Sequence, residues 1–134
     1  MDVTEYVKYY RGILTKETCT FIQGGEYDWQ QSTYSSHKGQ VDSDKRVDMD
    51  EAWVKNGDEQ YESIKYGFEN AIKKYSVDFP LFSVQRTTDF RINKYSEGGF
   101  MSRHCDNIHH SHGQQYGYPQ VTALLYLNDN YEGG

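Results

Sequence analysis

Apolar residues recur at helical spacing in two stretches of the first 80 residues. Thr15 is placed to cap a short helix over 16–22, and Gly24 and Gly25 follow it as a stop signal. A longer helix is predicted over 58–75, and Pro80 closes that segment. Its apolar positions form one stripe, because they fall three or four residues apart: Tyr61, Ile64, Phe68, Ile72 and Tyr75.

The rest of the pattern predicts strands. Residues 6–14 and 27–35 are expected to be strands, with a charged loop over 37–50. After residue 83 the chain alternates in the manner of strands over 87–95, 100–106 and 121–127. The second and third of these strands are separated by a polar loop over 107–119.

Alternation also assigns side chains to faces. In 87–95, Phe90 and Ile92 share one face, while Arg91, Asn93 and Tyr95 share the other. In 121–127, one face carries Thr122, Leu124 and Tyr126.

Helices come first and strands follow, without a βαβ rhythm. This order predicts an α+β fold with helices packed on an antiparallel sheet. The 134 residues suffice for one domain, so we expect a single domain over 1–134. Its helical support would cover about 1–80 and its core strands about 83–134.

Composition narrows the class of protein. Aromatic residues make up 16% of the chain, with 13 Tyr, which suits strands and half-buried pockets. The net charge of -6 argues against a general nucleic-acid binder. We expect no membrane association, because no long apolar stretch is evident. We expect a cytoplasmic location, because no signal peptide is evident and two cysteines, Cys19 and Cys105, do not make a disulfide framework.

The most informative residues are His104 and Asp106. On a strand, positions two apart share a face, so an imidazole and a carboxylate could bind one metal ion while Cys105 points to the opposite face. This ligand pair with open coordination positions is typical of non-haem Fe(II) sites, which use two His and one carboxylate.

Residues 90–107 resemble the iron-binding core of 2-oxoglutarate/Fe(II)-dependent oxygenases, and in particular the prolyl 4-hydroxylase-like branch. The stretch carries Tyr95, a turn at Gly98 and Gly99, and then the His-x-Asp motif. Residues 121–134 are similar to the same branch, with a Tyr-Leu-Asn element at 126–128 and Glu-Gly-Gly at 132–134. The resemblance is specific over 90–134 and weaker over the helical part.

The resemblance implies a fold and a reaction. The fold would be a double-stranded β-helix (a jelly-roll, cupin-like barrel) with N-terminal helices packed on the major sheet, incomplete at the C-terminus. The protein would be a dioxygenase that hydroxylates a peptidyl proline or a similar side chain of a protein or peptide substrate. Its cofactor would be Fe(II) and its cosubstrate 2-oxoglutarate, with succinate and CO2 as co-products and ascorbate as reductant.

The resemblance also implies roles for individual residues. His104 and Asp106 would be metal ligands. Tyr126 would hydrogen-bond the distal carboxylate of 2-oxoglutarate. The remaining cosubstrate-binding residues would be Thr122, Leu124 and Tyr95.

Two family elements are expected beyond Gly134, namely the distal His ligand and the basic residue that anchors the cosubstrate. We therefore expect little or no activity from residues 1–134 alone. Arg86, Arg91 and Arg103 precede the motif or lie within it, and none of them is assigned the anchoring role.

Three questions stay open. A nucleic-acid demethylase of the same superfamily and a non-catalytic binding fragment are alternative functions. His109, His110 and His112 could bind Zn(II) or Ni(II), could touch the substrate, or could belong to a solvated loop. The hydroxylated residue and the oligomeric state are not specified by the sequence.

Overall fold

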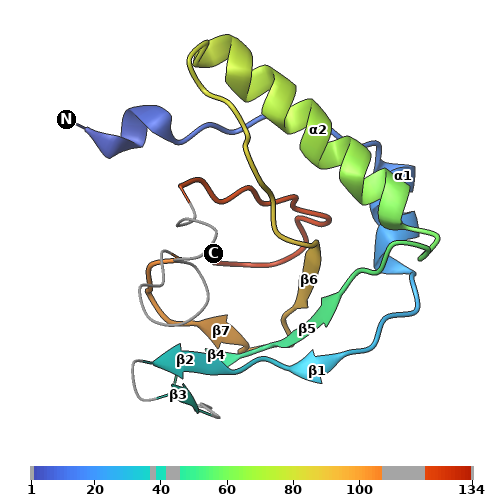
Figure 1. Ribbon diagram of the computed structural model, residues 1–134. Helices are drawn as coiled ribbons and strands as arrows, with labels where there is room; N and C mark the ends of the chain where they lie inside the picture. Colours follow the sequence, from blue (N-terminus) through green and yellow to red (C-terminus); the bar gives the residue numbers. More distant parts are fainter. Residues whose placement is uncertain (1, 37–38, 42–45, 107–119, 134) are drawn as a thin grey trace. The chain divides into compact units, whose positions relative to one another are not determined.

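The structure is a computed structural model that describes residues 2–36, 39–41, 46–106 and 120–133 (Figure 1). The chain divides into two compact units. The helical unit comprises Met1–Glu26, Val54–Phe90 and Leu125–Gly134, and the sheet unit comprises Tyr27–Trp53 and Arg91–Leu124. Within the described ranges every helix belongs to the first unit and every named strand to the second, so the predicted α+β class is confirmed.

The helical unit contains a 3-10 helix, η1 (Val3–Tyr6), and two α-helices, α1 (Lys16–Gln23) and α2 (Tyr61–Asp78). The sequence prediction of α1 is confirmed at both ends. The Thr15 hydroxyl accepts a hydrogen bond from the Thr18 N–H, and Gly24 is the C-cap residue. The predicted second helix exists, but it begins and ends three residues later than expected. Its start is delayed because the residues before Tyr61 form turns. One of these turns is fixed by the Asp58 carboxylate, which accepts a hydrogen bond from the Lys55 N–H.

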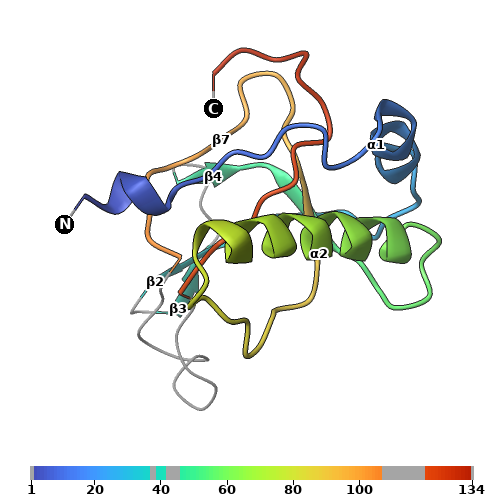
Figure 2. The same cartoon turned by 90° about the horizontal axis from the view of Figure 1, so that it is seen from above.

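Close packing holds the helical unit together. Gly67 of α2 is buried, and a Cβ built there would lie 2.9 Å from Leu125 Cδ1 and 3.1 Å from Leu14 Cδ2. Glycine at this position therefore lets two leucines approach the helix backbone. In both views α1 lies beside the N-terminal half of α2 (Figures 1 and 2).

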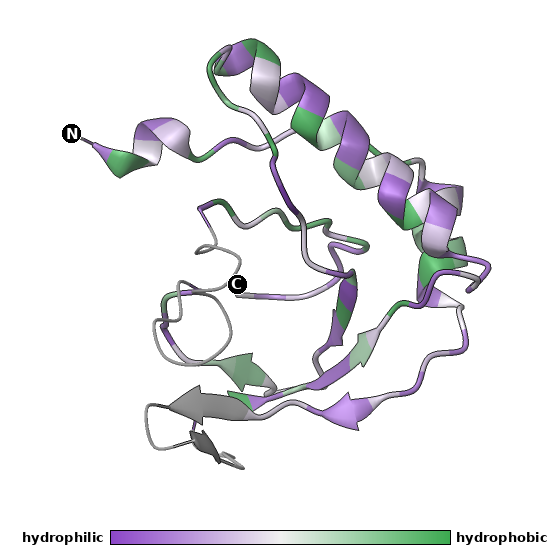
Figure 3. Cartoon of the chain, in the orientation of Figure 1, coloured by the Kyte–Doolittle hydropathy of each residue, from purple (hydrophilic) through white to green (hydrophobic). Residues whose placement is uncertain are grey.

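Aromatic rings cluster around the C-terminal end of α2. Tyr75 packs against Phe79 and Phe82, with ring centroids 4.6 and 4.8 Å apart. Tyr6 stacks on Phe79 at 5.3 Å. Figure 3 shows hydrophobic and hydrophilic residues interspersed along α2, and of the predicted apolar stripe Ile64 is buried.

The sheet unit contains short antiparallel strands. Its largest sheet has the order β1-β5-β6, with β1 (Gln30–Gln31), β5 (Asp50–Trp53) and β6 (Arg91–Lys94). The pair β2 (Tyr34–Ser36) and β3 (Gly39–Val41) and the pair β4 (Val47–Asp48) and β7 (Phe100–Met101) form two further ladders. Ala52 and Val47 are each only 1% exposed and belong to the core of this unit.

The register of β5 and β6 defines two faces of the three-stranded sheet. Trp53 is paired with Arg91 and Glu51 with Asn93, so these four side chains share one face, which we call the Trp53 face. Asp50 is paired with Lys94 and Ala52 with Ile92 on the opposite face, the Lys94 face. The predicted separation of Arg91 and Asn93 from Ile92 is thus confirmed.

Three strand predictions are wrong. Residues 6–14 include the end of η1 and an irregular segment, because the Asp2 carboxylate caps the Thr4 N–H and starts a 3-10 turn instead. The strand predicted over 100–106 is only Phe100–Met101, so His104 and Asp106 do not lie on a strand. Its ladder with β4 has two residue pairs and ends at the hydrogen bond from Ser102 N–H to the Arg46 carbonyl.

The third correction concerns Val121–Leu127, which the structure describes as irregular. Strand propensity is realised only where a neighbouring backbone supplies hydrogen-bond partners, and no described strand pairs with this segment.

The remaining strand boundaries differ more modestly. The segment 27–35 is divided between β1 and β2, and 87–95 shrinks to β6. Part of the predicted loop 37–50 forms β3 and β4. No described helix is long and apolar enough to cross a membrane.

Candidate metal centre

The turn between β6 and β7 leads the chain into the candidate site. Gly98 has a φ of +77°, and a Cβ at Gly99 would lie 2.8 Å from the Asp48 carbonyl oxygen. The Gly98–Gly99 pair therefore permits a tight turn close to β4 that side chains larger than hydrogen would obstruct. The next residues after β7 are those of the His-x-Asp motif.

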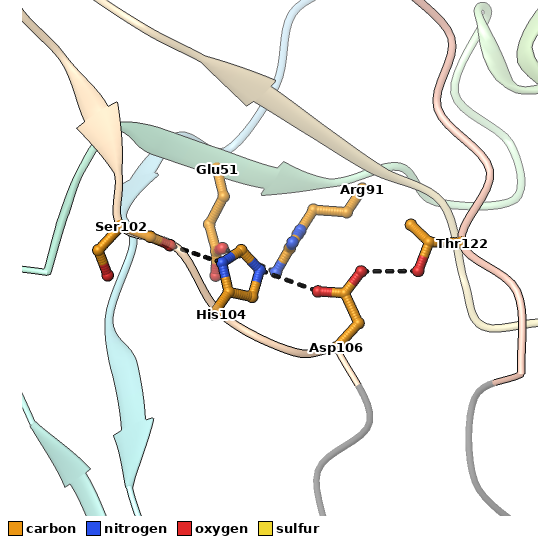
Figure 4. A network of polar contacts seen from close by, with 6 residues as sticks. All are labelled: Glu51, Arg91, Ser102, His104, Asp106 and Thr122. Carbon is orange, nitrogen blue, oxygen red and sulfur yellow. Dashed lines mark hydrogen bonds and ion pairs between the residues drawn. The ribbon is translucent and has the colours of Figure 1, made fainter. Parts of the chain in front are cut away.

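His104 and Asp106 converge although they lie in an irregular segment. His104 Nε2 is 2.9 Å from Asp106 Oδ1 (Figure 4). Their side chains are 33% and 49% exposed, so the pair is accessible from solvent. The structure therefore brings together the two residues that the motif singled out.

Ser102 fixes the tautomer of His104. The Ser102 carbonyl oxygen lies 2.8 Å from His104 Nδ1, and a carbonyl can only accept a hydrogen bond. Nδ1 therefore carries a hydrogen. The 2.9 Å contact between Nε2 and the Asp106 carboxylate is a hydrogen bond when Nε2 also carries a hydrogen, whereas the neutral ring has on Nε2 the lone pair that a metal ion would need. Orientation of a ligating imidazole by a backbone carbonyl is common in metal sites.

Thr122 fixes the carboxylate in the same manner. Its hydroxyl donates a 2.6 Å hydrogen bond to Asp106 Oδ2, which leaves Oδ1 directed at the imidazole (Figure 4). The sequence placed Thr122 in a cosubstrate pocket, whereas here it contacts a candidate metal ligand. This contact spans 16 residues, so local sequence patterns gave no signal of it.

The donor geometry fits a divalent metal. Nitrogen and oxygen ligands about 2.1 Å from a metal ion, at adjacent octahedral positions, are separated by about 3 Å. The 2.9 Å between Nε2 and Oδ1 is compatible with this spacing and is also the usual length of a hydrogen bond between the two groups.

Glu51 is a polar residue that sequence reasoning missed, and Arg91 is one to which it assigned no role. Arg91 Nη1 lies 3.2 Å from Glu51 Oε2, and the hydroxyl of buried Ser32 donates to the same oxygen at 2.9 Å. Figure 4 shows both side chains extending from β5 and β6 toward the segment that carries His104. The alternation of 87–95 gave the face of Arg91, but its partner lies 40 residues away.

The other predicted site residues are exposed. Tyr95 and Leu124 belong to the sheet unit and are 49% and 65% exposed. Tyr126 is 64% exposed and belongs to the helical unit. Cys105, expected to face the layer behind the motif, is exposed because the motif lies in an irregular segment and not on a strand.

A complete metal-binding group is not seen in the described part of the chain. No cluster of three or more His, Cys, Asp or Glu side chains is arranged there to hold an ion. His109, His110 and His112 lie outside the described residues, as does His37.

Comparisons with known proteins give no further guide to this site. Neither a protein-family model, nor a curated protein, nor a solved structure matches the chain.

Proposed function

We propose that this protein is an Fe(II)/2-oxoglutarate-dependent dioxygenase that hydroxylates a peptidyl proline or a similar side chain. The observation that carries the proposal is the 2.9 Å approach of His104 Nε2 to Asp106 Oδ1, with each group oriented by its own hydrogen-bond partner. The resemblance of 90–134 to prolyl 4-hydroxylase-like enzymes supplies the reaction class. The fold proposed with it is a double-stranded β-helix of which the short antiparallel strands form a part.

His104 and Asp106 would be two of the residues that hold the metal. The Ser102 carbonyl keeps the imidazole in the tautomer whose lone pair is on Nε2. The Thr122 hydroxyl holds the carboxylate so that a single oxygen, Oδ1, faces the ion. Of the remaining coordination positions, one would be needed by a second His and the others by cosubstrate and dioxygen.

When bound, Fe(II) with 2-oxoglutarate and dioxygen supplies the oxidation that places one oxygen atom on a substrate C–H group and the other in succinate, with release of CO2. The protein's contribution is to orient ligands and substrate and to limit access of water. In this proposal Tyr95, Leu124 and Tyr126 contribute to the cosubstrate pocket, and ascorbate is the reductant.

Metal binding is the first test. Mn(II) replaces Fe(II) without redox chemistry, and its free concentration can be followed by electron paramagnetic resonance. We expect one bound Mn(II) per chain. Loss of a residue that hydrogen-bonds a metal ligand typically lowers metal affinity about 10–100-fold. Loss of a ligand itself should cost more, so His104→Ala and Asp106→Ala should each weaken Mn(II) binding by more than this.

A matched control keeps the metal test specific. Asp48→Ala removes an exposed carboxylate of the neighbouring strand β4 and should leave Mn(II) affinity unchanged. Equal binding by wild-type protein and by the His104→Ala variant would refute the metal site, and with it the oxygenase proposal.

Turnover distinguishes the remaining alternatives. Succinate is measured in the presence of Fe(II), 2-oxoglutarate and ascorbate, with a proline-containing peptide or with alkylated DNA as substrate. Succinate formation coupled to DNA repair would replace the prolyl reaction by nucleic-acid demethylation. If the full protein binds the metal but forms no succinate with either substrate, a non-catalytic binding function would be favoured.

A further inference from the structure

The turn that precedes α2 contains the one Asn-Gly step of the sequence, Asn56–Gly57. Both residues are exposed. Gly57 has a φ of +120°, and a Cβ built on it would meet no other part of the protein within 4 Å. Because glycine has no side chain, the backbone nitrogen of Gly57 is open to approach by the neighbouring Asn56 side chain.

Hydrogen bonds hold the two ends of this turn but not the Asn56 side chain. The Lys55 N–H donates to an Asp58 carboxylate oxygen at 2.7 Å, and the Asp58 N–H donates to the Lys55 carbonyl oxygen at 3.0 Å. Among the residues that the structure describes, none accepts or donates a hydrogen bond to the Asn56 amide group. The amide is therefore free to rotate toward the Gly57 nitrogen.

An amide and a backbone nitrogen placed in this way can cyclise. The Gly57 nitrogen loses its proton and forms a bond with Asn56 Cγ, and the side-chain nitrogen of Asn56 leaves as ammonia. The product is a five-membered succinimide ring. Water then opens the ring: attack at Cγ gives aspartate, and attack at the backbone carbonyl carbon gives isoaspartate, in which the peptide bond runs through Cγ. Water is the only co-reactant.

We propose that Asn56 is a modification site at which the folded protein deamidates spontaneously and forms isoaspartate. Two other asparagines provide internal comparisons, Asn70 in α2 and Asn93 in β6. The residues that follow them, Ala71 and Lys94, carry side chains, and their backbones belong to regular secondary structure. Their nitrogens are therefore less accessible to an attacking amide than that of Gly57.

The modification would disturb the start of α2. The N-cap residue, Gln60, makes no side-chain capping hydrogen bond, so the first turn relies on the bond from the Tyr61 N–H to the Asp58 carbonyl oxygen at 3.0 Å. Isoaspartate at position 56 adds one carbon to the backbone inside the turn that Asp58 closes. Aspartate leaves the backbone unchanged and adds only a charge, so isoaspartate should disturb the turn more.

The test is incubation of the folded protein at mildly alkaline pH, followed by peptide mapping with mass spectrometry. The peptide that contains Asn56 should gain the mass difference between a hydroxyl and an amino group. This change should be at least about 10-fold faster than at Asn70 or Asn93, because an exposed turn opens at a much lower free-energy cost than a helix or strand. Isoaspartyl methyltransferase with labelled S-adenosylmethionine measures the isoaspartate formed.

Two variants control for the chemistry. Asn56→Gln keeps an amide but lengthens the side chain, so cyclisation would need a six-membered ring, and methyl labelling of this turn should be lost. Gly57→Ala keeps the asparagine and places a methyl group beside the attacking nitrogen, which should slow the reaction. Alanine is strained at a φ of +120°. Circular dichroism therefore checks the fold, and Asn56→Gln carries the test if Gly57→Ala is perturbed.

The outcomes are independent of the oxygenase proposal, because this reaction needs no metal and is measured in the presence of a chelator. Equal rates at Asn56 and Asn70, or undiminished methyl labelling in Asn56→Gln, would overturn the modification site. The isoaspartate fraction, separated by ion exchange, should unfold at a lower denaturant concentration than fresh protein, with unchanged Mn(II) affinity. An unchanged midpoint would overturn the inferred effect on α2.

Discussion

The helical unit and the sheet unit are each stabilised internally by a different kind of interaction. The helical unit relies on shape: leucines approach α2 at Gly67, and rings stack around Tyr75 and Phe79. The sheet unit has short strands and groups its polar side chains in pairs, such as Glu51 with Arg91 and His104 with Asp106.

This difference indicates where stability and chemistry reside. Apolar packing stabilises a fold but offers no ligands, whereas exposed, oriented polar pairs add little stability and can bind metal or substrate. Substitutions in the helical unit should therefore change the free energy of unfolding, and those at polar pairs of the sheet unit should change binding.

The largest stability effect is expected from Ile64→Ala. Ile64 of α2 is 6% exposed, so truncation removes buried surface and leaves a cavity, at a cost of about 2–5 kcal/mol. Denaturant unfolding followed by far-UV circular dichroism reports this change, because the described helices all belong to the helical unit. Mn(II) affinity of the folded variant should be unaffected.

Tyr66→Ala is the control for that substitution. Tyr66 lies on the same helix and is 60% exposed, so its removal should change stability by about 0.5 kcal/mol. Both tryptophans, Trp29 and Trp53, belong to the sheet unit, so their fluorescence reports that unit separately. If Ile64→Ala shifted the denaturant midpoint equally by circular dichroism and by tryptophan fluorescence, the two units would not differ in stability as proposed.

Local sequence information predicted the two α-helices well, but not the 3-10 helix η1. The 3.6-residue period of α2 and the cap at Thr15 depend on residues within a few positions of one another. Strands need a partner, and this is why Val121–Leu127 has strand-like alternation but no strand structure here.

The candidate site was predicted for a partly wrong reason. His104 and Asp106 were expected to meet because a strand places alternate residues on one face, yet they meet in an irregular segment. Residues two positions apart can bring their side chains within reach of each other both on a strand and in the irregular backbone seen here. Thr122 and the Glu51–Arg91 pair depend on contacts 16 and 40 residues apart, which no local pattern specifies.

Thr122→Val should have the next largest effect. It removes the hydroxyl that orients Asp106 while preserving side-chain shape, and Mn(II) affinity should fall about 10-fold. Thr122→Ser keeps the hydroxyl and should bind Mn(II) nearly as well as wild type. Unchanged affinity in the valine variant would show that the hydrogen bond does not position the carboxylate.

Thr15→Ala should destabilise the helical unit by about 1 kcal/mol, because the Thr18 N–H loses its capping partner. Denaturant midpoints measured by circular dichroism provide the test, with Thr15→Ser as the variant that retains the cap. Here the expected change is in stability alone. A weaker Mn(II) affinity in folded Thr15→Ala would contradict the separation of packing from binding.

The smallest effect concerns alkaline pH. The Tyr10 hydroxyl donates a hydrogen bond to the Asp78 carboxylate at the end of α2. Desolvation, this hydrogen bond and the negative charge of Asp78 raise the pKa of Tyr10 from 10.0 to about 12. Because the pKa is raised on folding, the contribution to stability is complete below pH 10 and is lost as the pH rises to about 12.

Tyr10→Phe isolates this contribution, because it preserves the ring but cannot ionise or donate. Denaturant midpoints of wild type and variant should differ below pH 10 and converge as the pH approaches about 12. The change should appear in circular dichroism, since Tyr10 and Asp78 both belong to the helical unit. A constant difference between the two proteins across this range would show that the Tyr10–Asp78 bond does not couple ionisation to folding.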